Sequence, residues 1–180
     1  MPTRNFQQGS FVAAEKLAPE TLTKSHHPTQ VSCAGCTIGC EHIYSVRGDG
    51  ASIPDGVRLE YENLFALGPL CAIDDADTVL QASQRCDQLG LDSISAGGTI
   101  AFAMECAERG LIDAPWVRFG RAESLLKAIE LIGQCDGLGD PFAEGNRRIS
   151  RTIGQELISF ALEVKGFEIP GYETIERCRQ

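Results

Sequence analysis

The sequence lacks any apolar run of the roughly 20 residues that a membrane-spanning helix requires. Its first residues, Met1 to Phe6, also lack the apolar stretch that a secretory signal peptide carries. We therefore expect a cytoplasmic protein with no membrane partner. In that compartment the eight cysteines are expected to be reduced or bound to metal instead of paired in disulfides.

Positive charge is also scarce, because 16 Lys and Arg stand against 25 Asp and Glu and the net charge is −9. Proteins that bind a phosphate backbone use clustered Lys and Arg. We therefore expect no nucleic-acid partner. The G-x-G-x-x-G, P-loop, H-E-x-x-H and nucleophile-elbow motifs are absent as well, so none of these signatures points to an enzyme class.

Helical periodicity dominates the rest of the chain and predicts a mainly α fold with minor β. Asp74-Asp75 offers an N-cap and Gly90 an end to one helix, and Gly110 ends the next. The expected helices are a short one at Pro19–Lys24, one through Val79–Leu89 that ends at Gly90, one through Ile100–Ala107, one through Leu125–Ile132, and a shorter one from Glu144 to Ile153.

Two short segments, Glu41–Arg47 and Val57–Tyr61, have β character and are separated by turn residues at 48–56. They predict a β-hairpin that follows a cysteine-rich loop. A further strand is expected at Phe160–Lys165, before Gly166. The length of 180 residues suits one domain with a small appendage, and residues 1–32 read as an irregular lead-in to it.

The strongest chemical signal is Cys33, Cys36 and Cys40 in a glycine-containing loop. Thiolates bind iron tightly, and close spacing lets several sulfurs converge on one iron–sulfur cluster. Spacing alone also allows zinc, or neither metal. No second C-x-x-C pair or histidine pair follows to complete a zinc site. A [4Fe–4S] cluster needs a fourth ligand, which this loop does not contain.

Two acidic motifs give weaker signals. In Asp87 to Asp92 a helix ends at Gly90, and the turn offers carboxylates and backbone groups to a heterocycle with N–H donors; the alternative is a plain helix end with solvated acids. In Glu60-Tyr61-Glu62, strand alternation places both glutamates on one side. A buried pair could share a proton for acid–base chemistry, and the alternative is a solvated strand face.

Taken in order, these segments resemble the middle domain of the tungsten-pterin aldehyde:ferredoxin oxidoreductases. The cysteine loop is similar to the family's C-x-G-C-P-I-G-C, with Thr37 in place of proline, and the resemblance covers roughly residues 2–172. The other matching segments are Pro2–Gln7, 60–62, Ala66-Leu67-Gly68, Cys71–Asp75, the D-x-x-G-L-D motif at Asp87–Asp92, Ile100–Glu105 and Val164-Lys165-Gly166.

The resemblance implies a domain over 33–172, three cysteine ligands to a [4Fe–4S] cluster at Cys33, Cys36 and Cys40, and a divergent tail at 173–180. It also implies a tungsten (or molybdenum) ion held by two pterins. The residues against one pterin are then Asp87, Gly90, Leu91 and Asp92, and Glu62 takes the place of a glutamate near the metal that moves a proton. The implied reaction oxidises an aldehyde to a carboxylate, with ferredoxin or a similar carrier as electron acceptor.

The chain is much shorter than a full enzyme of this kind, so we expect a segment that is inactive alone or completed by chains carrying the missing domains. Cys178 does not sit in the family's second pterin motif, so the fourth cluster ligand is expected elsewhere. Two alternatives remain from the sequence. One is a stand-alone iron–sulfur electron-transfer module, and the other is a cofactor-free remnant.

Overall fold

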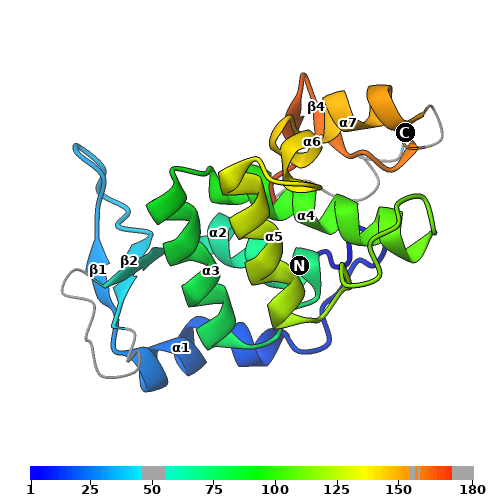
Figure 1. Cartoon of the computed structure of the whole chain (residues 1–180). Helices are drawn as coiled ribbons and strands as arrows, with labels where there is room; N and C mark the ends of the chain where they lie inside the picture. The colour runs from blue at the N-terminus through cyan, green and yellow to red at the C-terminus, as the bar shows by residue number, and fades with distance from the viewer. Residues whose placement is uncertain (46–55, 155–156, 158, 172–180) are drawn as a thin grey trace.

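The computed structural model describes residues 1–45, 56–154, 157 and 159–171. Helices form the body of the molecule, with a small sheet at one end and a short hairpin at the other (Figure 1). The mainly α fold with minor β is therefore confirmed. Along the described chain no helix is long and apolar enough to cross a bilayer.

Each helix predicted from periodicity is present, and two short ones were missed. The helices are α1 (Pro19–His26), α2 (Tyr61–Leu67), α3 (Ala76–Leu89), α4 (Ser93–Glu108), α5 (Ala122–Gln134), α6 (Gly139–Ala143) and α7 (Asn146–Ile153), with 3-10 turns at Ala14–Leu17 and Pro69–Cys71. Asp75 caps α3 by accepting from the Thr78 N–H, as predicted. The helices α2 and α6 escaped prediction because each is shorter than two turns.

The expected β-hairpin is present in a three-stranded antiparallel sheet. Its strands are β1 (Thr29–Val31), β2 (Glu41–Tyr44) and β3 (Val57–Leu59), with β2 in the middle. The strand β1 lies inside the stretch expected to be irregular, and it pairs across the cysteine loop with β2. The predicted extension to Arg47 and most of the turn at 48–56 fall outside the described residues.

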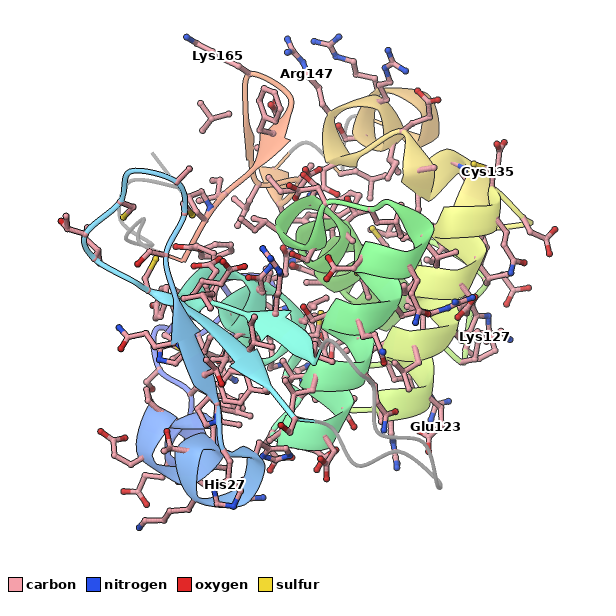
Figure 2. The ribbon with its side chains drawn as sticks, turned by 90° about the vertical axis from the view of Figure 1, so that its left-hand side faces the viewer. His27, Glu123, Lys127, Cys135, Arg147 and Lys165 are labelled. Atoms are coloured by element: carbon pink, nitrogen blue, oxygen red, sulfur yellow. The ribbon has the colours of Figure 1, made fainter. Side chains whose placement is uncertain are left out.

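The second hairpin is shorter than the predicted strand at 160–165. It consists of β4 (Glu163–Val164) and β5 (Phe167–Glu168), because Phe160 already lies in a turn. Lys165 at its tip and Arg147 on α7 lie at the same end of the molecule (Figure 2). The stem of Arg147 passes close to Gly166. The hairpin therefore packs against α7 at that end of the helical body.

Helix α4 lies at the centre of the fold and is buried on nearly every side. Its sequence is apolar or small around the whole circumference, which is the pattern of a core helix. At Gly97 the helix meets α2 so closely that an added Cβ would lie 2.5 Å from the carbonyl oxygen of Ala66. Only glycine permits this approach, so Gly97 fixes how α2 crosses α4.

The N-terminal segment is bound to the same helix through a buried polar contact. Asn5 donates from Nδ2 to Glu105 at 2.7 Å and to the carbonyl of Phe160 at 3.1 Å. Arg109 pairs with the same glutamate. Because a buried carboxylate is costly without partners, these contacts tie three distant segments together at α4.

One local prediction is wrong. Glu60-Tyr61-Glu62 is not a strand with both glutamates on one side. Glu60 is the N-cap of α2, where its carboxylate accepts from the Asn63 N–H while the Asn63 side chain accepts from the Glu60 N–H. The reciprocal cap satisfies two exposed helix-end donors, and this local gain outweighs the β character of the run.

The glycine contact gives a direct test of the packing. We expect Gly97→Ala to lower the free energy of unfolding by about 1–3 kcal/mol, because the methyl group overlaps the α2 backbone and α2 must move. Urea denaturation followed by circular dichroism measures this. Ser95→Ala on the same helix is the control and should change stability by less than about 0.5 kcal/mol. Equal stability of G97A and the unmodified protein would contradict the close crossing.

Candidate functional site

The three candidate ligand cysteines lie on one loop that projects beyond the sheet between β1 and β2 (Figure 1). Cys33 and Cys40 are exposed and Cys36 is half-buried. The loop is held at its base by Gln30, whose side chain donates to the carbonyl of Gly39 at 2.7 Å. The described cysteines are all free thiols, so these three remain available as ligands.

The loop fits an iron–sulfur cluster in its donor types. The sulfur of Cys36 accepts from the Ile38 N–H at 3.4 Å, which is the kind of backbone contact that tunes a cluster's potential. Nevertheless, no group of three ligating side chains within the described ranges is close enough to hold a metal ion. The ligand set at Cys33, Cys36 and Cys40 therefore remains a prediction.

The predicted pterin motif forms the sharp connection between α3 and α4. Gly90 ends α3 in the left-handed conformation, with φ of 69°. Asp92 then starts α4 at once, accepting from the Ser95 N–H at 2.7 Å. One oxygen of Asp92 therefore caps the helix, whereas Asp87 and Gly90 are exposed and Leu91 is half-buried. The predicted turn geometry is confirmed, and its role in binding a pterin stays a prediction.

Helix α2, which carries Glu62, contacts the start of α4 through Asn63. The side chain of Asn63 donates to the hydroxyl of Ser93, the residue after Asp92. Glu62 itself is only 8% exposed, and its Oε2 accepts from the Gly171 N–H at 2.7 Å. Its Oε1 is buried and has no hydrogen-bond partner among the residues that the structure describes. Burial raises the pKa of Glu62 in spite of the Gly171 hydrogen bond, and nearby Glu60 raises it further.

A charged link connects the base of the cysteine loop to the pterin motif. Glu41, which follows Cys40, pairs with Arg58 of β3 at 3.0 Å. The pKa of Asp87 is raised overall. Partial burial is the main cause, nearby Arg58 opposes the rise, and Glu41 adds to it. Sheet and helix are also joined by Ser83, which donates to the carbonyl of Arg58 at 3.0 Å. Arg58 therefore interacts both with the base of the cysteine loop, at Glu41, and with the Asp87–Asp92 motif, at Asp87.

A cavity of about 190 Å³ opens beside the pterin motif. Gly90, Leu91 and Asp92 form one part of its wall, and α4, α5, α6 and the α6–α7 connection form much of the rest. The remaining wall includes Glu168 of β5, which is buried. Sequence analysis missed Glu168, because an acid beside Phe167 in a short hairpin resembles a solvated position. Local alternation would place apolar Phe167 inside and the acid outside, so no local signal identifies Glu168 as buried.

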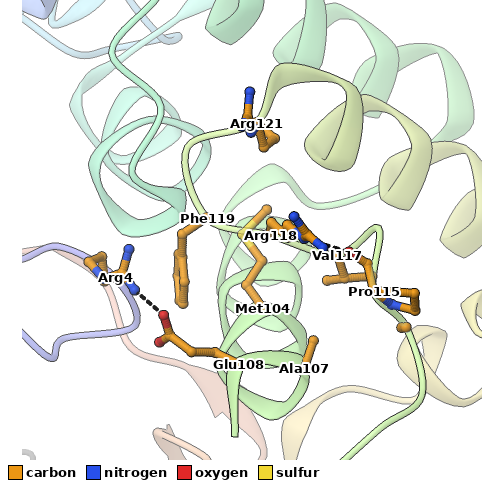
Figure 3. A pocket seen from close by; sticks show the side chains of 10 residues that line it. Arg4, Met104, Ala107, Glu108, Pro115, Val117, Arg118, Phe119 and Arg121 are labelled. Atoms are coloured by element: carbon orange, nitrogen blue, oxygen red, sulfur yellow. Dashed lines mark hydrogen bonds and ion pairs between the residues drawn. The ribbon is translucent and has the colours of Figure 1, made fainter. Parts of the chain in front are cut away.

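A larger cavity of about 530 Å³ lies elsewhere, beside α4 and the loop that leads into α5 (Figure 3). It is lined by Arg4, Arg118 and Arg121 among others. Arg4 pairs with Glu108 and stacks on Phe119, and Arg118 donates to a backbone carbonyl. None of the residues predicted to carry chemistry lines it, so the cavity beside Asp92 is the better candidate.

The cysteines outside the loop have structural roles. Cys71, Cys86 and Cys106 are fully buried, and burial raises the pKa of Cys86 and of Cys106 to about 12. Such thiols stay protonated at neutral pH and pack as small apolar groups. Cys178 lies outside the described residues.

The helical body, the cysteine loop and the D-x-x-G-L-D turn define a class of mainly helical segment in which a small sheet carries the cysteine loop. The family model "Aldehyde ferredoxin oxidoreductase, domains 2 & 3" matches residues 1–178. This chain belongs to the aldehyde ferredoxin oxidoreductase family.

Curated relatives agree with this assignment. The chain is 38% identical over 178 residues to a tungsten-containing aldehyde ferredoxin oxidoreductase of Thermococcus kodakarensis and 36% identical to that of Pyrococcus furiosus. It is also 29% identical over 148 residues to an aliphatic sulfonate oxidoreductase, WOR-like subunit, of Pyrococcus furiosus. The first two matches cover 96% of this chain but only 28% of each relative, so the chain is similar to a segment of those enzymes.

A solved structure supports the fold. The active site complex BamBC of benzoyl coenzyme A reductase matches 92% of this chain and 25% of the solved chain, with a TM-score of 0.72 and 22% sequence identity. The similarity shows that the helical body, the small sheet and their order form a recurring fold. It carries no assignment of substrate.

The buried glutamate gives a prediction for the dependence of stability on pH. The folded protein holds the proton of Glu62 more tightly than the unfolded chain, because burial raises the pKa of Glu62. Its contribution is therefore intact below the unfolded value of about 4.3 and is lost as pH rises through the raised folded value. We expect Glu62→Gln to stabilise the protein relative to the unmodified chain at pH 7, and to lose this advantage near pH 4.

Urea unfolding at pH 4, 5, 6, 7 and 8 measures that difference. Glutamine keeps an oxygen that accepts from the Gly171 N–H, so the substitution removes mainly the charge. Glu123→Gln is the control, because Glu123 is exposed on α5, and it should show no such trend. A difference between E62Q and the unmodified protein that stays constant from pH 4 to 8 would contradict the raised pKa.

Proposed function

We propose that this chain is a segment of a tungsten- or molybdenum-pterin oxidoreductase that oxidises aldehydes to carboxylates and passes electrons to ferredoxin or a similar carrier. The chain spans 28% of the length of its first curated relatives. It is therefore inactive alone, and the remainder of the enzyme comes from further sequence or from partner chains. The observation that carries the proposal is the cavity that the Gly90–Asp92 turn shares with a buried acid.

The turn and its surroundings suit a pterin by their chemistry. The exposed carboxylates of Asp87 and Asp92 accept hydrogen bonds, which matches the amino and ring N–H groups of the heterocycle. The Gly90 conformation lets the backbone approach a ligand with no side chain in the way, since nothing lies within 4 Å of an added Cβ. When bound, a tungsten–pterin centre supplies oxygen transfer and two-electron redox chemistry.

Glu62 is proposed to hold or accept a proton during the reaction. The hydrogen bond from Gly171 holds its Oε2, so the unpartnered Oε1 is the atom that binds the proton. Burial raises the pKa of Glu62 and favours the neutral acid, which suits a group that accepts a proton during the reaction. The aldehyde and water then give a carboxylate, with release of two electrons and protons.

The loop of Cys33, Cys36 and Cys40 is proposed to supply three ligands to a [4Fe–4S] cluster that carries those electrons onward. Its exposed position supports this role, because an electron carrier must approach the cluster closely. Ile38 at the tip of the loop is 75% exposed, and Phe167 on the hairpin is 71% exposed. These apolar side chains lie where we propose that the rest of the enzyme packs.

Anaerobic reconstitution with iron and sulfide tests the cluster. A small thiol is added as an exogenous fourth ligand, and iron, acid-labile sulfide and the electron paramagnetic resonance signal after reduction are measured. We expect close to four irons per chain in the unmodified protein. Cys36→Ser should remove most of the iron and the signal. Cys135→Ser, which changes an exposed cysteine on α5, is the matched control and should keep both.

The possible outcomes separate the candidate functions. If the folded protein binds no iron although all three loop cysteines are intact, the cluster proposal for this chain is wrong. A cluster in the protein isolated from its source, with neither tungsten nor molybdenum, would favour the stand-alone electron-transfer module. A colourless protein free of iron, tungsten and pterin would favour the cofactor-free remnant.

A further inference from the structure

Glu168 is buried where the local sequence predicts exposure. Along β5, Phe167 is 71% exposed whereas Glu168 is only 8% exposed. The partner strand repeats this inversion, because Val164 is 61% exposed. The hairpin therefore turns its apolar side chains outward and an acid inward. Burying a carboxylate is costly unless it has a specific set of partners, so this position requires an explanation.

The protein surrounds Glu168 with features that hold its side chain in one place. Its Oε1 accepts from the Asn146 N–H at 3.1 Å and from the Thr99 hydroxyl at 3.3 Å. Two glycines leave room for it. A Cβ on Gly98 would lie 2.7 Å from the Glu168 Cβ, and a Cβ on Gly145 would lie 3.3 Å from Oε1. Four positions on two helices thus fix one carboxylate.

The second oxygen of this carboxylate receives no hydrogen bond from the residues that the structure describes. Glu168 lines the cavity that also contains Asp92, whose cap to α4 uses only one of its two oxygens. Two carboxylates at one cavity therefore retain unused acceptor capacity. The cavity is built to receive donors that the described protein does not supply.

The lining of the cavity restricts the chemistry of its ligand. Among the described residues its lining has no lysine or arginine, which argues against an anionic ligand. Leu91, Ile132 and Phe142 give it apolar walls, which suit the faces of a flat ring. At about 190 Å³ it is smaller than the roughly 300–1,000 Å³ of a site that encloses a whole drug-sized ligand. It therefore fits one end of a larger molecule, namely a flat heterocycle with N–H groups at its edge.

We propose that Glu168 is a pterin-recognition residue, which accepts from the amino and ring N–H groups of the heterocycle that Asp92 also contacts. This inference rests on the proposed function and extends it. It assigns the second hairpin to the cofactor pocket, and it gives Gly98, Thr99 and Gly145 the role of positioning one carboxylate. A divalent cation is the competing ligand for paired carboxylates, and the apolar walls favour the heterocycle.

The test compares two probes that differ in one donor. Pterin (2-amino-4-oxopteridine) carries an exocyclic amino group, and lumazine (2,4-dioxopteridine) carries an oxygen in its place. Each is titrated into the isotopically labelled chain, and the nuclear magnetic resonance shifts of backbone amides report both affinity and position. We expect pterin to shift the amides of Gly90 and Gly145 and to bind at least tenfold more tightly than lumazine. Pterin presents its amino group beside the N3–H, so a carboxylate can accept from both, whereas lumazine presents the N3–H between two carbonyl oxygens that repel a carboxylate.

The substitutions separate this inference from the proposed function. Glu168→Gln should raise the Kd for pterin about tenfold and remove most of the preference over lumazine, while Asp92→Asn should weaken pterin as well. Glu123→Gln on exposed α5 is the control and should change neither value. The amide spectrum of each variant also shows whether the fold is retained.

Three results would contradict the proposal in different ways. If D92N weakens pterin but E168Q keeps both affinity and preference, Glu168 is not a recognition residue and the proposed function stands. If the unmodified chain binds neither probe, both the inference and the pterin part of the proposed function are overturned. If magnesium or calcium alone shifts the same amides and pterin does not, the cavity is a cation site.

Discussion

The rest of the structure depends on one constraint, which is that Gly97 and Gly98 at the centre of α4 have no Cβ atom. At Gly97 the helix lies against the backbone of α2, and at Gly98 it lies against the side chain of Glu168. Two neighbouring residues therefore admit two different elements on adjacent faces of one helix. A single methyl group at either position would push α2 or the second hairpin away. The buried acids Glu62 and Glu168 owe their positions to these two contacts.

The same helix also organises the charged groups. Its N-cap, Asp92, follows directly on the end of α3, so two helix termini meet beside the cavity. The short segment from β5 onward supplies the buried acid Glu168 to the cavity wall, and three residues later the Gly171 N–H donates to Glu62. Arg58 pairs with Glu41 at the base of the cysteine loop, and it also opposes the rise in the pKa of Asp87 that burial causes. We infer that these contacts hold the proposed cluster loop and the proposed pterin-binding turn in a fixed arrangement.

Local rules predicted α3, α4 and α5, because each has a full apolar pattern together with a recognisable start or end such as Asp75 or Gly90. They failed at α2, where Glu60-Tyr61-Glu62 alternates like a strand and the reciprocal cap with Asn63 decides the matter. They also could not identify Glu168. Its burial depends on Gly98 and Gly145, which are far away in sequence. The motif at Asp87–Asp92 was therefore visible in the sequence, whereas the opposing wall of its cavity required the fold.

We propose that α4, the Gly90–Asp92 turn and the second hairpin together line part of a cofactor pocket. The most direct measurement is a crystal structure of the chain soaked with pterin. We predict electron density for the ring in the cavity, with its amino edge within hydrogen-bonding distance of the Asp92 and Glu168 carboxylates. Density for the ring elsewhere, or a filled cavity in which Glu168 contacts only protein donors, would contradict the account.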